Sequence, residues 1–326
     1  MEYLSRIVKL VGGMNQFQFH PRCKEVKLTH MCFADDLIMC YKGDFISMYL
    51  MLQSFKLFSQ SSGLQANIQK SSLYCCGVSD SDVQRIAAIF GFPRHFPPFR
   101  FLGVPICSKR LTSSQCDALV DKMTCRIKIW RSRHLSYMAR VQLINFVLMS
   151  LHMYWAQVFI LPKKVLRDIV QVCRSFLWSG QSFSWNLRSV AWSKLCCGKN
   201  FGGLGFKDVF LWNIAHMGKY LWVVANKQEN SWIKWVNSVY LKNASWWEYS
   251  PKANSSWYWK KVCHVKDILK QHYSLTDMCV MPSYSVKAVY NKLASDSVPV
   301  HWDFFSGRGW VRLNTNSSAG WPSRGV

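Results

Sequence analysis

The sequence predicts an α+β protein in which short antiparallel hairpins and one helix come first and a mainly helical region follows. Two observations predict this order. Apolar runs too short for an independent helix flank Asp35 and Asp36, which indicates a β-hairpin with the aspartates at its turn. From Thr112 onwards, apolar residues recur at helical spacing instead. With 326 residues and 50% apolar content, the chain can build two or three compact units with a buried core.

The segment 44–62, directly after the hairpin, is predicted to be a helix that packs on the back of a sheet. Its apolar stripe consists of Phe45, Met48, Leu52, Phe55 and Phe58. Gly63 provides the stop signal. Residues 64–78 return to a strand-like pattern, with apolar positions at Ile68, Leu73 and Tyr74.

The helical region begins with a capping box formed by Thr112 and Gln115. One face of the following helix carries Leu119, Met123, Ile127 and Trp130. The segment 144–161 is almost long enough to span a bilayer, but Asn145, His152 and Gln157 interrupt it. We therefore expect a buried or partly buried helix there, and no membrane partner.

The region 178–259 is dense in tryptophan. Aromatic side chains interleaved with lysine can stack on single-stranded bases. They more often fill core positions because of their large apolar area, and we favour the core interpretation here.

The charge of the chain indicates a polyanionic partner. It carries 41 Lys and Arg against 17 acidic residues, a formal charge of +24. Nucleic acid is the favoured partner, and its binding is expected to weaken steeply with added salt. A generally basic surface without a specific ligand is the alternative.

The thirteen cysteines are scattered, and none forms a C-x-x-C pair. The adjacent pairs at 75–76 and 196–197 suit neither tetrahedral zinc nor a disulfide. We expect reduced thiols, no zinc, and an intracellular protein, in the nucleus or the cytoplasm, that is not secreted.

Several segments of the chain form a recognisable series. It starts at residues 1–6 and continues as FQFHPRCKEVKLTHMCFADDL at 17–37 and SGLQANIQKSS at 62–72. Further segments are FLGVPI at 101–106, LSYMARVQLI at 135–144, VAWSKLCCGKNFGGLGF at 190–206 and YSVKAVYNKL at 284–293. In this order, the segments closely resemble the reverse transcriptases of non-LTR retrotransposons, in particular the plant LINE-type elements.

This resemblance implies a site for nucleotidyl transfer. Asp35 and Asp36 would be catalytic metal ligands for Mg²⁺, because carboxylate oxygens are hard ligands that suit this ion. Lys70 falls at a lysine that lies near the incoming nucleotide in the family, where it would stabilise the departing pyrophosphate.

The resemblance also implies how an RNA or DNA template-primer would be bound. Phe101, Leu102 and Gly103 match the primer-grip hairpin, and Gly103 serves either a tight turn or a close approach of backbone to nucleic acid. The thumb-like helices would present a basic face consisting of Arg126, Lys128, Arg131, Arg133 and Arg140. Simple solvation of these charges is the alternative.

The sequence departs from the family at both ends. The family's polymerases carry another essential aspartate upstream, and residues 1–34 contain none, so we expect weak metal binding and no polymerase activity by this chain alone. After His301 the expected zinc-binding stretch is missing. Residues 309–316 resemble the opening strand of a ribonuclease H domain, with Asn316 in place of a metal-binding aspartate.

We therefore predict four regions and keep three functional hypotheses. The regions are a partial reverse-transcriptase palm at 1–108, a helical thumb-like part at 109–225, a tryptophan-rich linker region at 226–301 and a junction with a ribonuclease-H-like remnant at 302–326. The chain is a reverse-transcriptase fragment that is inactive alone, a non-catalytic basic nucleic-acid-binding protein, or an unstable pseudogene product.

Overall fold

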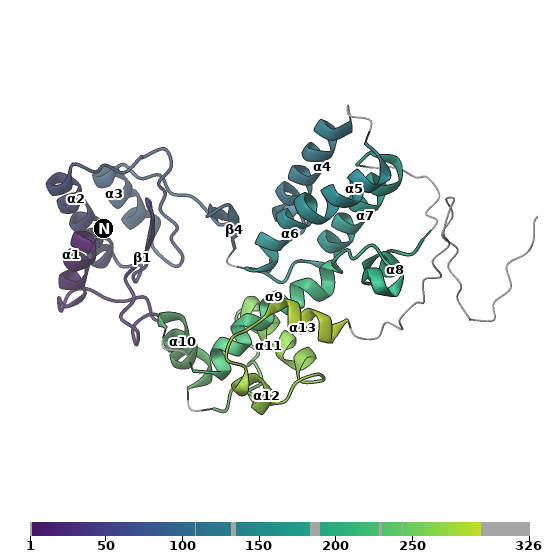
Figure 1. The fold of residues 1–326 in the computed structure, drawn as a ribbon. Coiled ribbons are helices and arrows are strands. Elements are labelled where there is room, and N and C mark those ends of the chain that lie inside the picture. The colour runs from purple at the N-terminus through teal and green to yellow at the C-terminus, as the bar shows by residue number, and fades with distance from the viewer. Residues whose placement is uncertain are drawn as a thin grey trace, which may run out of the picture. The chain divides into compact units, whose positions relative to one another are not determined.

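The computed structural model describes residues 2–107, 109–131, 135–182, 190–227, 230–242 and 244–294 (Figure 1). The chain divides into two units, one formed by residues 1–110 and 223–263 and the other by residues 111–222 and 264–326. The described residues are mostly helical and include two small antiparallel sheets. This agrees with the predicted α+β class.

The first unit opens with helix α1 (Glu2–Gly12), the hairpin β1 (His30–Phe33) and β2 (Asp36–Met39), and helix α2 (Phe45–Ser62). The prediction for α2 is confirmed at both ends. The Asp44 carboxylate accepts a hydrogen bond from the Ser47 backbone N–H at 2.9 Å and caps the first turn. Gly63 ends the helix in the left-handed conformation, with φ of 73°.

Helix α2 packs mainly against α1, an element that the sequence analysis did not predict. Their shared core contains Leu4, Ile7, Val8, Val11, Phe17, Met51 and Phe58. The hairpin contributes to this core through Leu37 and Met39, which are partly buried against it. The apolar side of the hairpin is thereby anchored to the two helices.

The strand predicted for residues 64–78 is wrong. This segment is a loop, and one parallel bridge between Leu73 and Arg94 is its only extended pairing among the described residues. A local turn competes with a strand, because the backbone N–H groups of Lys70 and Ser71 both donate to the Asn67 carbonyl at 3.0 Å. The bridge holds Leu73 in the core while its neighbours remain in a loop.

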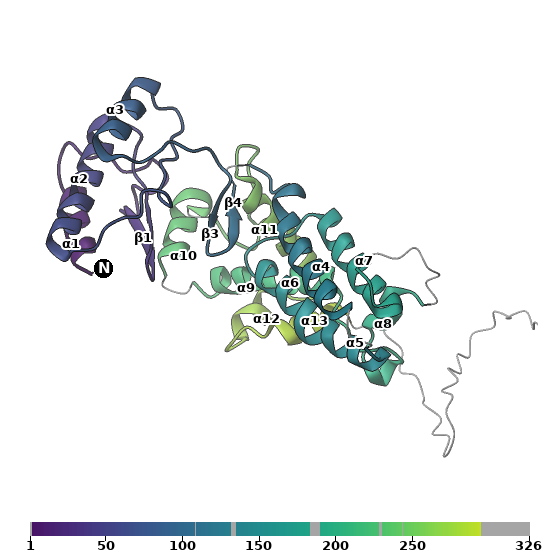
Figure 2. The same ribbon diagram turned by 90° about the horizontal axis from the view of Figure 1, so that it is seen from above.

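Beyond this loop, the unit contains helix α3 (Asp80–Phe90) and a second hairpin, β3 (Phe99–Phe101) and β4 (Val104–Ile106). Figure 2 shows β3 and β4 side by side. The unit also includes α10 (Ser231–Val236) and the turn η4 (Asn237–Leu241). An aromatic cluster surrounds Trp259, with the Tyr240 ring stacked on it at a centroid distance of 4.6 Å.

The second unit contains a helical bundle in which α4 (Asp117–Arg131) packs on α6 (Met149–Ala156) and α7 (Lys163–Ser179) (Figure 2). The predicted face of α4 is confirmed, since Leu119, Met123 and Ile127 are buried. Half of the predicted capping box is present, because the Thr112 backbone N–H donates to Gln115 Oε1 at 2.9 Å. A 3₁₀ turn, η1 (Ser114–Cys116), precedes the helix.

The predicted helix over 144–161 is confirmed as far as Ala156. It consists of a π turn, η2 (Ile144–Leu148), followed by α6, and it continues α5 (Tyr137–Leu143). Its residues Ile144, Leu148 and Trp155 are buried in the bundle. In the part of the chain that the structure describes, no helix has both the length and the apolar character needed to cross a membrane.

The remaining helical elements are short, apart from α9 (Val209–Ala225) and α11 (Trp257–Leu269). They are α8 (Trp192–Cys196), η3 (Lys199–Phe201), α12 (Leu275–Val280) and α13 (Val286–Leu293). Five tryptophan side chains of the tryptophan-rich region are buried, namely Trp192, Trp212, Trp222, Trp246 and Trp259, and the other described ones are partly exposed. This supports the core interpretation of the tryptophan-rich region.

Candidate functional site

The Asp35–Asp36 pair lies at the tip of a tight hairpin. Phe33 pairs with Asp36, so the loop consists of only Ala34 and Asp35. Ala34 has a φ of 49°, as the first central residue of a tight hairpin turn often does. Both aspartates are exposed. The predicted hairpin is therefore confirmed, with Asp35 in the turn and Asp36 as the first residue of β2.

Polar and apolar contacts fix the base of this hairpin. The His30 ring is hydrogen-bonded to the Ser5 hydroxyl at 2.8 Å and to the Thr29 hydroxyl at 3.0 Å. Burial, and then the nearby positive charge of Lys9, lower the pKa of His30. The ladder continues past the strands, because the Cys40 backbone N–H donates to the Thr29 carbonyl at 2.7 Å. The two carboxylates are thus carried on a supported element rather than a free loop.

Two aspartates do not complete a two-metal centre. Among the described residues, no group of three potential metal ligands includes Asp35 or Asp36. A site that holds two Mg²⁺ ions needs further oxygen ligands beside these two carboxylates. The described residues therefore do not fit such a centre.

Lys70 is exposed in the turn of residues 68–70. Its backbone N–H donates to the Asn67 side-chain oxygen at 3.2 Å, which fixes the local backbone. Within the described part of the chain, its ammonium forms no ion pair with Asp35 or Asp36. The role of Lys70 beside a nucleotide remains a prediction.

The second hairpin has the turn that its sequence requires. Phe101 pairs with Val104, and the two loop residues, Leu102 and Gly103, have φ values of 49° and 78°. Two positive φ values are typical of a type I′ turn. A side-chain carbon added at Gly103 would meet no atom within 4 Å. Of the two uses that the sequence left open, the tight turn is the one that the structure contains.

The basic residues Arg126, Lys128 and Arg140 have described side chains, and their contact with nucleic acid stays a prediction. Arg126 and Lys128 are both exposed on α4. Residues two positions apart on a helix point about 200° away from each other. Arg140 is only partly exposed and caps α7, because its Nη1 atom donates to the carbonyl oxygens of Leu177 and Trp178 at 3.2 and 3.3 Å. The side chain of Arg131 and all of Arg133 lie outside the described residues.

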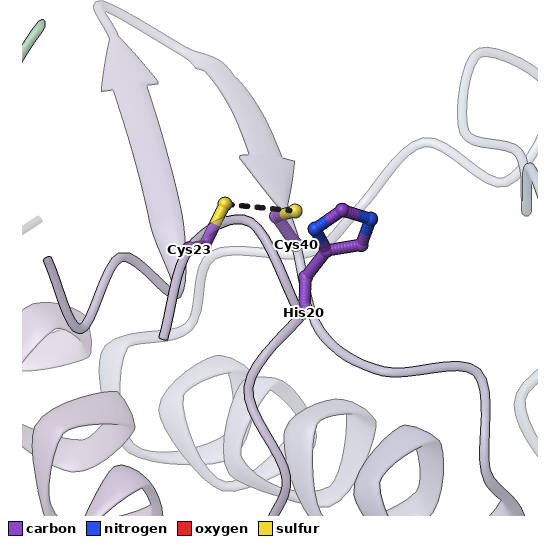
Figure 3. Close-up of side chains that lie close together, drawn as sticks. All are labelled: His20, Cys23 and Cys40. Carbon is purple, nitrogen blue, oxygen red and sulfur yellow. Dashed lines mark hydrogen bonds between the residues drawn. The ribbon is translucent and has the colours of Figure 1, made fainter. Parts of the chain in front are cut away.

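A second group of chemistry-bearing side chains, not singled out from the sequence, lies close to the base of the first hairpin. His20, Cys23 and Cys40 place one potential ligand atom each within 4.8 Å of one another. Figure 3 shows the two sulfur atoms, 3.9 Å apart, with the His20 ring beside them. The spacing H-x-x-C at 20–23 was the available sequence signal, but Cys40 is brought to it only by the hairpin.

Hydrogen bonding makes the two thiols unequal. The hydrogen bond with Cys40, together with smaller contributions that include the nearby His20, lowers the pKa of Cys23 to about 6 against the opposing effect of burial. The same contact, together with burial, raises the pKa of Cys40 far above its usual value. His20 Nδ1 accepts a hydrogen bond from the Arg22 backbone N–H at 3.2 Å, so this nitrogen carries a lone pair in the structure.

Comparison with known proteins finds two similar proteins of Arabidopsis thaliana. One, provisionally named ribonuclease H protein At1g65750, is 26% identical over 163 residues, which are 49% of this chain and 26% of that protein. The other, uncharacterized mitochondrial protein AtMg00310, is 27% identical over 124 residues, which are 38% of this chain and 80% of that protein. The chain thus spans about a quarter of the first relative's length. No family model matches the sequence.

Proposed function

We propose that this chain derives from the reverse transcriptase of a plant-type non-LTR retrotransposon and carries the aspartate hairpin of its palm. The observation that carries the proposal is the exposed Asp35–Asp36 pair at the tip of a tight hairpin, with Asp35 in the turn and Asp36 at the start of β2. Support comes from the sequence segments in family order and from relatives that are plant proteins, one of them named as a ribonuclease H protein.

The chemistry of the pair defines what this chain can contribute. In a complete polymerase, Mg²⁺ would supply charge stabilisation at the transferred phosphate, and the carboxylates would hold it. The described residues supply two carboxylates without a third ligand nearby. We therefore expect polymerase activity only when a further carboxylate ligand is supplied beside this pair.

A complementation assay tests this proposal. The fingers and upstream palm of a plant non-LTR element are fused before Met1, and template-dependent primer extension is measured with Mg²⁺ for the fusion and for the chain alone. We expect extension only by the fusion, and its loss in Asp35→Asn and Asp36→Asn. Asp121→Asn, at an exposed aspartate of α4, is the matched control and retains activity.

Two results would contradict the proposal. Template-dependent synthesis by the 326-residue chain alone would overturn its inactivity. Extension by the fusion that is unchanged in Asp35→Asn would remove the hairpin from the chemistry.

A second candidate function is nucleic-acid binding without catalysis, and the formal charge of +24 favours it. Binding of single-stranded RNA is measured between about 50 and 200 mM salt, the range in which phosphate contacts lose affinity steeply. Binding that persists in Asp35→Asn but weakens in the double variant of Arg126→Ala and Lys128→Ala supports this function. Binding that does not depend on salt would exclude it.

A further inference from the structure

We propose that His20, Cys23 and Cys40 form a binding site for a soft divalent cation, Zn²⁺, with three protein ligands and an open fourth position. This site replaces our sequence-based expectation that the chain binds no zinc. It does not rest on the proposed polymerase ancestry, because its ligands are separate from Asp35 and Asp36.

The distance between the two sulfur atoms suits a shared metal ion. Tetrahedral Zn²⁺ with Zn–S bonds of about 2.3 Å separates its two sulfur ligands by about 3.8 Å. The Sγ atoms of Cys23 and Cys40 are 3.9 Å apart. A disulfide would require them to approach to about 2.05 Å. The metal therefore fits the observed spacing, whereas a disulfide requires a large movement.

The donor set selects the class of metal. Two thiolates and an imidazole are typical ligands of Zn²⁺, while Mg²⁺ and Ca²⁺ require oxygen ligands. No carboxylate belongs to the group, and the described residues add no fourth His, Cys, Asp or Glu to it. The fourth position would be taken by water or by a ligand from outside the chain.

Backbone hydrogen bonds already place the ligands. The Cys23 N–H donates to the His20 carbonyl at 2.8 Å, which closes a turn with Pro21 at its second position. On the other side, the Cys40 N–H donates to the Thr29 carbonyl at 2.7 Å. The turn and the end of the hairpin are therefore held in position before a metal binds, so little rearrangement is needed.

Burial differs among the ligands in a way that permits metal entry. Cys23 is 7% exposed, whereas His20 and Cys40 are partly exposed. A metal ion can reach the group through its exposed side. Once bound, it would link His20 and Cys23, in the loop before β1, to Cys40, the residue that follows β2. The site would fasten the base of the hairpin that carries Asp35 and Asp36.

Zinc stoichiometry of the full chain tests the site. Tag-free protein is purified with a thiol-free reductant and equilibrated with buffered Zn²⁺, and bound metal is measured by mass spectrometry. We expect one Zn²⁺ per chain, and its loss in Cys23→Ser and in Cys40→Ser. Cys32→Ser is the matched control, because Cys32 lies in the same hairpin, is exposed and is not part of the group; it retains the metal.

A third variant and a second readout separate loss of ligands from loss of fold. His20→Ala leaves both thiols in place and is expected to weaken Zn²⁺ binding at least about tenfold. Even the loss of a residue that only hydrogen-bonds to a metal ligand lowers metal affinity by about this factor. With Co²⁺ as the probe, the wild-type chain should show thiolate-to-cobalt charge-transfer absorption, which decreases in each cysteine variant. Far-ultraviolet circular dichroism is recorded for every variant to verify its helix content.

Three results would overturn the proposal. One is a reduced, folded chain that takes up no Zn²⁺. Another is equal uptake by wild type, Cys40→Ser and His20→Ala, which would assign the metal to other cysteines. The last is a metal-free chain in which peptide mapping finds Cys23 and Cys40 joined as a disulfide despite the reductant. The primer-extension assay plays no part here, so the two proposals fail independently.

Discussion

Arg140 caps a helix that begins 23 residues later in the chain: its Nη1 atom donates a hydrogen bond to the Leu177 carbonyl at 3.2 Å. The last carbonyl groups of a helix lack partners within the helix and carry a partial negative charge. A guanidinium that reaches them from α5 satisfies this end of α7 and joins the two helices. The residue predicted as a nucleic-acid contact thus has a structural use in the second unit.

Arg140→Ala should destabilise the second unit by about 1–2 kcal/mol, because it removes charge-assisted hydrogen bonds to partly buried carbonyls. Urea denaturation followed by circular dichroism measures this loss. Arg126→Ala, at an exposed position of α4, is the control and should change the free energy of unfolding by no more than about 0.5 kcal/mol. Equal stability of the two variants would show that the cap contributes nothing.

Asn213 connects α9 to the chain between α6 and α7, and its replacement should be more costly. Its side-chain oxygen accepts from the Leu161 N–H at 2.9 Å, and its amide donates to the carbonyls of Ala156 and Phe159 at 3.1 and 2.7 Å. Asn213→Ala leaves these buried groups without partners, so we expect a loss of about 2–4 kcal/mol.

Thermal unfolding measures this loss, and Asn291→Ala, at an exposed position of α13, is the control. A melting temperature for Asn213→Ala equal to that of the control variant would contradict the prediction.

Stability should fall in mild acid because of His152. This side chain is 1% exposed, its ring nitrogens have no hydrogen-bond partner among the described residues, and burial followed by the neighbouring His216 lowers its pKa from 6.5 to about 4. Between these values the unfolded chain binds a proton that the folded chain excludes. The stabilisation is therefore complete above about pH 6.5 and decreases by about 3 kcal/mol as the pH falls to about 4.

Urea denaturation at a series of pH values tests this. His152→Leu removes the titrating group and should flatten the profile in that range, whereas His272→Leu, at an exposed histidine, should leave its slope unchanged. A profile for His152→Leu as steep as that of the wild type would exclude the mechanism.

The turn of the second hairpin should respond in opposite directions to two substitutions. Leu102→Asn creates the Asn-Gly pair that type I′ turns prefer, and it should stabilise the hairpin by a few tenths of a kcal/mol or more. Gly103→Ala forces a side chain into a φ of 78°, which costs about 1–2 kcal/mol. Hydrogen exchange of the amides in β3 and β4 reports both effects, and protection that changes in the same direction in both variants would refute the turn assignment.

The predictions that are confirmed rest on local signals. Asp44 and Gly63 mark the ends of α2, and the spacing of Leu119, Met123 and Ile127 identifies the buried face of α4. The apolar residues on either side of Asp35 and Asp36 likewise form both strands of the hairpin, so the hairpin is a local structure. In each case the deciding residues lie within a few turns or strands of one another, so no distant contact is needed.

The failures depend on contacts that are distant in sequence or on competing local bonds. The strand expected around Leu73 is a loop because Asn67 closes a turn before it. Cys40 meets His20 and Cys23 only after the hairpin has formed, and no spacing rule relates residues 17 positions apart.

The backbone at Ala34 restricts which residues position 34 can hold, because its φ is 49°. Valine and isoleucine carry β-branched side chains that clash in this conformation, whereas the exposed positions 35 and 36 accept carboxylate or amide side chains alike. Ala34→Val would therefore distort the hairpin itself, while Asp35→Asn would leave its backbone unchanged. An alanine at position 34 thus reports on the shape of the turn and is independent of any chemistry at the two carboxylates.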